Sequence, residues 1–155
     1  MSNTVRLKNY LNVFEEWEAA AALTPGHLVE LTSANKVQKH STAGETAIPM
    51  FALEDELQGK EISDDYAADD PVQVWIPTRG DRVYALLANN ENVAVGDFLV
   101  SNGDGTLKKY VPAEVSGDSG FDSGTSLPDQ KVVAQALEEL NPTAGDAERI
   151  VVRIV

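Results

Sequence analysis

The feature that most constrains the fold of this chain is an internal repeat. Residues 24–40, TPGHLVELTSANKVQKH, align with residues 94–110, AVGDFLVSNGDGTLKKY, at a constant offset of 70. Asn35 then falls on Gly105. Asparagine and glycine best tolerate the positive φ angle of a tight turn, so the repeat preserves the turn rather than its side chains. The pattern predicts two copies of one supersecondary structure.

Two further pairs of segments follow in the same order. Residues 48–55, IPMFALED, align with residues 132–139, VVAQALEE, and residues 72–77, VQVWIP, align with residues 150–155, IVVRIV. The offsets are 84 and 78, because loops of unequal length separate the segments. One of these loops is the Gly-, Ser- and Asp-rich stretch 116–129. Each half therefore reads as strand, turn, strand, strand, loop, strand.

This order predicts a mainly β fold. Residues 72–76 and 150–155 are short runs rich in β-branched side chains, and turn residues separate the runs at close intervals. Such spacing is typical of a small barrel or sandwich. The run ALEEL, residues 136–140, consists of good helix formers, so a short helix there stays open.

We expect an N-terminal arm, residues 1–22, followed by a single β domain, residues 23–155, made of two related halves, 23–87 and 93–155. Residues 9–23 fit both a helical face and a strand alternation. We favour a strand that leads into the first half.

The charge balance restricts the partners. Asp plus Glu number 25 and Lys plus Arg number 12, so the formal net charge is −13. Such a surface repels the phosphates of nucleic acids. The chain has no cysteine, which excludes disulfides and zinc–thiolate sites. No apolar run approaches the ~20 residues that span a bilayer, and no signal sequence is recognisable. We expect a protein made in a cytoplasm that binds neither nucleic acid nor membrane.

The sequence holds no recognisable catalytic pattern. His27 precedes a predicted strand and His40 aligns with Tyr110, so both histidines are interpreted as structural. No serine lies in a G-x-S-x-G motif, and no P-loop or G-x-G-x-x-G occurs. Lys108 and Lys109 follow the turn instead of forming its tip, unlike the modified lysine of a lipoyl or biotinyl carrier. We expect no enzyme and no cofactor.

Two acidic stretches raise the question of a metal. NGDGT, residues 102–106, has a counterpart in the repeat without carboxylates, so we predict a hairpin tip at 102–105. SDDYAADD, residues 63–70, holds adjacent aspartate pairs and no glycine, unlike a calcium loop. We expect no metal, and a solvated acidic loop at 58–70 for which cation binding stays open.

The segments AAAALTPGHLVEL, FALED with its echo QALEE, and RIVVRIV resemble the capsid decoration (cement) proteins of tailed bacteriophages, the lambda-type head decoration proteins and their β-tulip relatives. The resemblance covers residues 19–155. It implies a small duplicated β-barrel of the β-tulip kind. It also implies a structural virion protein on the outer surface of the expanded capsid. Such a protein bridges subunits of the major capsid protein, stabilises the head against internal DNA pressure, and forms a homo-oligomer, a trimer or a dimer.

The arm is the candidate for partner binding, because it concentrates large apolar side chains at a terminus. Burying one of them is worth ~1.5–3 kcal/mol. The predicted partner-binding residues, for the capsid or a neighbouring subunit, are Val5, Leu7, Tyr10, Leu11, Phe14 and Trp17. In the alternative, the arm completes its own barrel. A host-glycan-binding head-fibre or tail module, or a β-barrel enzyme, also stays open as a function.

Overall fold

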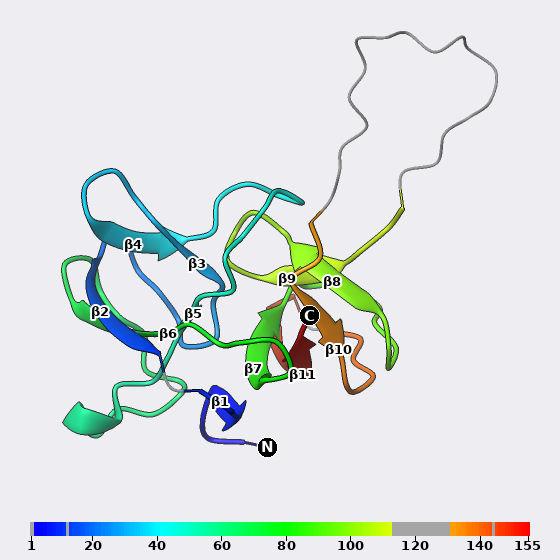
Figure 1. Ribbon diagram of the computed structural model, residues 1–155, viewed down its shortest axis with the longest axis horizontal. Coiled ribbons are helices and arrows are strands. Elements are labelled where there is room, and N and C mark those ends of the chain that lie inside the picture. Colours follow the sequence, from blue (N-terminus) through cyan, green and yellow to red (C-terminus); the bar gives the residue numbers. More distant parts are fainter. Residues whose placement is uncertain (1, 12, 113–130, 144) are drawn as a thin grey trace, which may run out of the picture.

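The computed structural model describes residues 2–11, 13–112, 131–143 and 145–155. The predicted loop at 116–129 lies outside the described residues. The described chain is almost entirely β-structure (Figure 1). Its strands are β1 (Arg6–Lys8), β2 (Phe14–Ala19), β3 (Val29–Leu31), β4 (Lys36–Lys39), β5 (Phe51–Ala52), β6 (Pro71–Trp75), β7 (Arg82–Leu87), β8 (Phe98–Ser101), β9 (Leu107–Lys109), β10 (Ala134–Ala136) and β11 (Glu148–Ile154), and one 3-10 turn, η1, covers Glu56–Gln58.

Five strands of the C-terminal half form a closed barrel, which we call barrel 2. Its order is β7-β11-β10-β8-β9, and β9 returns to β7 through the parallel pair Leu87↔Leu107. All other neighbours in this barrel are antiparallel. β1 adds to the outside of β7 as a sixth strand. The predicted mainly β, barrel-like fold is confirmed.

The N-terminal half forms a second sheet in the order β3-β4-β2-β6-β5, which we call barrel 1. A bridge between Leu28, just before β3, and Phe51 in β5 brings the two ends of this sheet together. The two barrels lie side by side in Figure 1, with β2, β3, β4, β5 and β6 in one and β7 to β11 in the other.

The two barrels have the same topology and the same register. β2, β3, β4, β5 and β6 correspond to β7, β8, β9, β10 and β11. Val29 pairs with Lys39 in barrel 1, and Leu99 pairs with Lys109 in barrel 2. Both partners are shifted by 70 residues, so the offset found in the sequence relates equivalent strand pairs of the two barrels. The offsets of 84 and 78 hold in the same way for the pairing of β5 with β6 and of β10 with β11.

The first strand of each repeat lies outside the half that was predicted to contain that repeat. β2 is the first strand of barrel 1, so residues 14–19 belong to the sheet and not to an arm. β7 is the first strand of barrel 2, although residues 82–87 were placed at the end of the first half. The sequences of β2, FEEWEA, and β7, RVYALL, share only the alternation of inward and outward side chains. Their residue types differ, so a comparison of residue types does not identify them as equivalent strands. Residues 136–140 form no helix, because Ala136 ends β10.

The turn that opens each repeat is capped by a different side chain in each barrel. In barrel 1 the Thr24 N–H donates to His27 Nδ1 at 2.9 Å. In barrel 2 the Ala94 N–H donates to Asp97 Oδ2, also at 2.9 Å. His27 is buried, and burial, helped by the charge of Lys39, lowers its pKa from 6.5 to about 4. The histidine therefore stays neutral and accepts the hydrogen bond that an aspartate accepts in the other copy.

The turn of barrel 1 packs closely on barrel 2. Gly26 has φ 97°, and a Cβ there would lie 3.1 Å from the Tyr84 carbonyl oxygen, so only glycine fits. The Leu86 N–H donates to the Gly26 carbonyl at 3.1 Å. The half-buried guanidinium of Arg149 donates to the carbonyl oxygens of Pro25 and Ile62, at 3.0 and 2.6 Å. These backbone contacts, together with the Arg149 side chain, fix the two barrels against each other.

We predict that His27→Asn reduces the acid sensitivity of the fold. The pKa of His27 is lower in the folded than in the unfolded chain, so the unfolded chain takes up the proton first as the pH falls below 6.5. The contribution of neutral His27 to stability is complete above pH 6.5. It is lost progressively down to about pH 4, by roughly 3 kcal/mol in total. Asparagine accepts the same hydrogen bond and does not titrate.

Urea unfolding at pH 7 and pH 4.5 measures this effect. Wild type should lose more stability between these values than the variant does. Asp97→Asn changes the equivalent turn of barrel 2 and should keep the wild-type dependence in this window. Equal losses for His27→Asn and wild type would contradict the assignment.

Candidate partner-binding surface

The N-terminal segment joins the two barrels. β1 pairs with β7 of barrel 2, with Arg6 opposite Val83, and β2 runs through barrel 1. Between them the Tyr10 N–H donates to Asp81 Oδ1 at 2.8 Å. Asp81 is fully buried and also accepts from the Thr78 N–H at 2.7 Å, so its carboxylate is a fixed anchor. The segment is therefore held at several points rather than extended from the domain.

Three of the six predicted partner-binding residues pack against the protein itself. Val5 is fully buried in the core cluster that includes the interior of barrel 2, and its N–H donates to the buried Glu54 carboxylate at 3.0 Å. Trp17 packs against the core of barrel 1, and its indole N–H donates to Glu15 at 2.8 Å. Leu7 is half-buried in β1. The inward position of Trp17 follows from strand alternation, because the odd-numbered residues of β2 point into barrel 1.

The other three predicted residues are exposed and lie close together in the chain. Tyr10 is 64% exposed, Leu11 60% and Phe14 42%. Val13, which was not among the predicted residues, joins them at 43%. We call Tyr10, Leu11, Val13 and Phe14 the N-terminal patch. Neighbouring exposed apolar side chains make this segment a candidate interaction surface.

A cleft of about 270 Å³ begins at Phe14. It lies between the N-terminal segment, η1 and the outside of barrel 1, and its lining residues are Thr4, Arg6, Phe14, Leu53, Glu54, Glu56, Leu57 and Gln73. The Arg6 guanidinium lies 5.1 Å from the centre of the Phe14 ring, and Lys8 Nζ lies 5.3 Å from the centre of the Tyr10 ring. Each ring thus has one cation over a face, which favours its observed position, and both rings remain partly exposed.

A second cleft, of about 260 Å³, is lined by Glu30 and His40 and by apolar side chains of barrel 1. His40 Nδ1 lies 2.8 Å from Ser101 Oγ, and His40 Nε2 lies 3.7 Å from Glu30 Oε2. Although serine, histidine and glutamate line up, Ser101 is fully buried and accepts the Gly103 N–H at 3.1 Å. A nucleophile must be able to reach its substrate, and a fully buried serine cannot. The contacts among Ser101, His40 and Glu30 instead join barrel 2 to barrel 1.

Glu30 is held ionised at the rim of this second cleft. Partial burial raises the pKa of its carboxyl, but hydrogen bonds from Ser41 and Gln38 outweigh burial and leave the pKa below its ordinary value. The Ser41 hydroxyl donates at 2.6 Å and the Gln38 amide at 2.8 Å. The carboxylate thus keeps its negative charge beside His40.

The acidic loop uses its carboxylates within the fold. Asp64 accepts the Glu61 N–H at 2.7 Å, and Asp70 accepts the Ala67 N–H at 2.8 Å, so both cap turns. Asp69 forms an ion pair with Lys36. Within the described ranges, no three His, Asp or Glu side chains converge as metal ligands.

The hairpin tip between β8 and β9 is built in the same way. Asp104 Oδ1 accepts the Thr106 N–H at 2.9 Å and the Thr106 hydroxyl at 2.5 Å. Partial burial raises the pKa of Asp104, but the hydrogen bonds from Thr106 and Asn102 outweigh it and leave the pKa below its usual range. Gly105 has φ 83° and matches Asn35, with φ 57°, at the turn of barrel 1.

Comparison with known proteins gives no relative: no protein-family model matches the chain, and no curated protein matches its sequence. Among the described residues, no helix is long and apolar enough to cross a membrane.

We predict that Asp104 stabilises the hairpin by capping and not by binding calcium. Asp104→Asn keeps an oxygen that accepts the Thr106 N–H but loses the charge, so it should cost less than removal of the acceptor. Asp104→Ala removes the acceptor and should cost about 1 kcal/mol. Thermal unfolding with calcium and with EDTA tests the claim. A calcium-dependent rise in the midpoint that Asp104→Asn abolishes would show a metal site instead.

Proposed function

We propose that this chain is a structural virion protein that binds the outer surface of the expanded capsid of a tailed bacteriophage. It bridges neighbouring subunits of the major capsid protein and stabilises the head against internal DNA pressure. The N-terminal patch carries the proposal. It presents two exposed aromatic rings, Tyr10 and Phe14, and two exposed aliphatic side chains on a segment that contacts both barrels. The resemblance of residues 19–155 to capsid decoration proteins supplies the class of partner.

The energetics are adequate for such a contact. Burying one large apolar side chain contributes ~1.5–3 kcal/mol, so several of them yield useful affinity after the cost of association. The anchor at Asp81 reduces that cost, because Tyr10 is already ordered before binding. A protein that binds only the expanded shell stabilises that state by mass action. Copies that associate as a trimer or dimer on the shell would add to this effect.

The duplicated fold suits a bridging role. Two barrels of one topology are held in fixed relation by the contacts of Gly26 and Arg149. A rigid two-barrel body that contacts two capsid subunits restrains their separation, whereas a flexible tether would not. A cement protein must resist outward displacement of subunits, and a fixed spacing between its two halves provides this resistance.

A binding experiment with surface variants tests the proposal. Deleting residues 2–17 would remove β1, most of β2 and the buried Val5, so point changes are required. We predict that Tyr10→Ser, Leu11→Ser and Phe14→Ser together weaken binding to undecorated expanded capsids at least 100-fold, measured by co-sedimentation. The unfolding midpoint should stay close to that of wild type, because these side chains are 42–64% exposed.

A matched control changes equally exposed apolar residues elsewhere. Ile48→Ser, Val95→Ser and Val111→Ser alter side chains that are 65%, 67% and 62% exposed, and this variant should bind as wild type does. If the N-terminal variant also binds normally, the patch is not the attachment site. If wild type does not bind capsids but binds a host glycan through Tyr10 and Phe14, the glycan-binding function replaces the one proposed.

A further inference from the structure

The repeat allows the outer faces of the two barrels to be compared position by position. Residues directly opposite each other on paired strands point to the same side of a sheet. In barrel 1 one such cross-strand row runs through β2, β6 and β5 to the residue before β3. We call it the outer row of barrel 1, and its members are Phe14, Trp75, Phe51 and Leu28.

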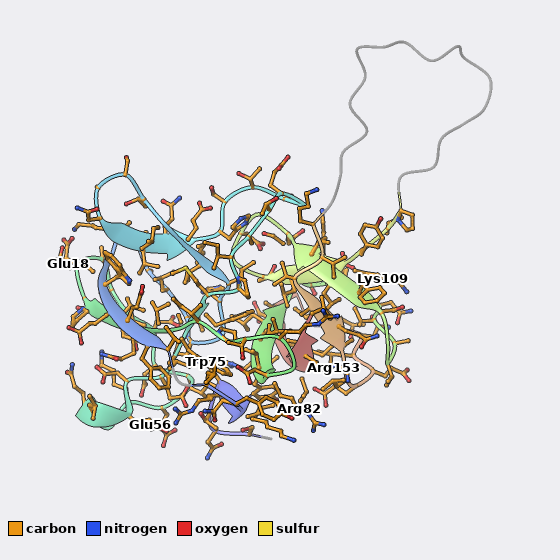
Figure 2. The ribbon with its side chains drawn as sticks, in the orientation of Figure 1. Glu18, Glu56, Trp75, Arg82, Lys109 and Arg153 are labelled. Carbon is orange, nitrogen blue, oxygen red and sulfur yellow. The ribbon has the colours of Figure 1, made fainter. Side chains whose placement is uncertain are left out.

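The outer row of barrel 1 is a docking face. Trp75, Phe51 and Leu28 are fully buried, although they point away from the interior of their own barrel. They belong to one apolar cluster together with Val5 and the interior residues of barrel 2. Figure 2 places Trp75 in the middle of the molecule, between the barrels. This row therefore holds barrel 1 against the rest of the chain.

The equivalent row of barrel 2 is exposed and cationic. The offsets 78, 84 and 70 carry Trp75, Phe51 and Leu28 to Arg153, Gln135 and Phe98. Arg82 takes the place of Phe14, because it pairs with Arg153 as Phe14 pairs with Trp75. The pairings Gln135↔Arg153 and Gln135↔Phe98 complete the row. The register of β1 on β7 shifts between Arg6 and Lys8, and this irregularity places Lys8 opposite Arg82, next to the row. Lys8, Arg82 and Arg153 are exposed, and Phe98 is 46% exposed. Figure 2 shows Arg82 and Arg153 close together on barrel 2.

The arrangement is unfavourable for the isolated chain. Like charges directly opposite each other on neighbouring strands destabilise a sheet, and this row sets Arg82 between Lys8 and Arg153. In the described part of the chain none of the three forms an ion pair with a carboxylate, although the chain carries 25 acidic residues. Arg153 donates to the Gln135 amide oxygen, and Lys8 lies over the Tyr10 ring.

We propose that the outer row of barrel 2 is a binding surface for an acidic segment of a partner protein. Carboxylates of that segment pair with Arg82, Arg153 and Lys8, and an apolar side chain beside them covers Phe98. This inference does not depend on the particle proposed above. It assigns to barrel 2 the face that barrel 1 already uses for docking, with an anionic occupant in place of an apolar one.

The geometry suits carboxylates. Neighbouring strands are ~4.8 Å apart, so three cations on β1, β7 and β11 cover ~10 Å. Acidic side chains on one face of a strand are ~7 Å apart, which lets two or three of them reach the row. Each guanidinium can bind a carboxylate through two parallel hydrogen bonds, and the two arginines therefore favour this group over a diffuse negative charge.

The net charge favours a short acidic segment over a nucleic acid. At −13 the protein as a whole repels a long polyanion, and three cations in one row are too few to offset that repulsion along many phosphates. A short peptide feels mainly the local field, because charges farther away than ~8 Å are largely screened at physiological salt.

Titration with two polyanions tests the inference. Poly-L-glutamate and an oligothymidylate of equal charge are added to ¹⁵N-labelled wild type at low salt, and amide shifts are followed. Poly-L-glutamate should shift the amides of Lys8, Arg82, Arg153, Gln135 and Phe98. Arg82→Gln with Arg153→Gln should weaken this binding at least 10-fold, without lowering the unfolding midpoint, because the variant removes a like-charge contact.

The control is Lys36→Gln with Lys60→Gln, which makes the same change in net charge on the N-terminal half and should bind as wild type does. No shift on the row with either polyanion would overturn the proposal. So would tighter binding of the oligothymidylate, which would identify a nucleic acid as the partner. A lower unfolding midpoint of the Arg82/Arg153 variant would assign the row a structural role and would also contradict the proposal.

Discussion

The structure depends on the burial of one apolar row on the outside of barrel 1. Trp75, Phe51 and Leu28 point away from their own barrel and are fully buried, in one cluster with Val5 and the interior of barrel 2. Fully burying three side chains of this size is worth roughly 5–9 kcal/mol, comparable to the net stability of a whole domain. Without this contact barrel 1 would expose these three large apolar side chains, so the two barrels form one structural unit.

Much of the fold was predictable from the sequence, because turns and alternation are local signals. The paired turns at Asn35 and Gly105 require a backbone that few residues adopt, and they gave the register of β3 with β4 and of β8 with β9. The structural equivalence of β2 and β7 had no such marker. A strand that has no turn residue at a fixed position can be recognised only by its alternation of apolar and polar residues. Any half-buried strand has this alternation, so it does not show which strands are equivalent.

The candidate site was predictable only in part, for a related reason. The sequence indicated which N-terminal side chains are large and apolar, but not which of them the chain itself would bury. Trp17 follows from alternation within β2, whereas the burial of Val5 depends on the pairing of β1 with β7, far away in the sequence. The cationic row was hidden as well, because Lys8, Arg82 and Arg153 are brought together only by strand register.

Duplication explains how one fold can carry both surfaces. When a unit is repeated, each position exists twice, and only one copy is needed to hold the two units together. Barrel 1 uses its outer row for that purpose, since Trp75 and Phe51 are buried there. At the matching positions of barrel 2, Arg153 and Gln135 are not required for packing, so they can change without loss of the core. The three neighbouring cations repel one another and are not needed for packing, which is consistent with the external acidic partner that we propose for this row.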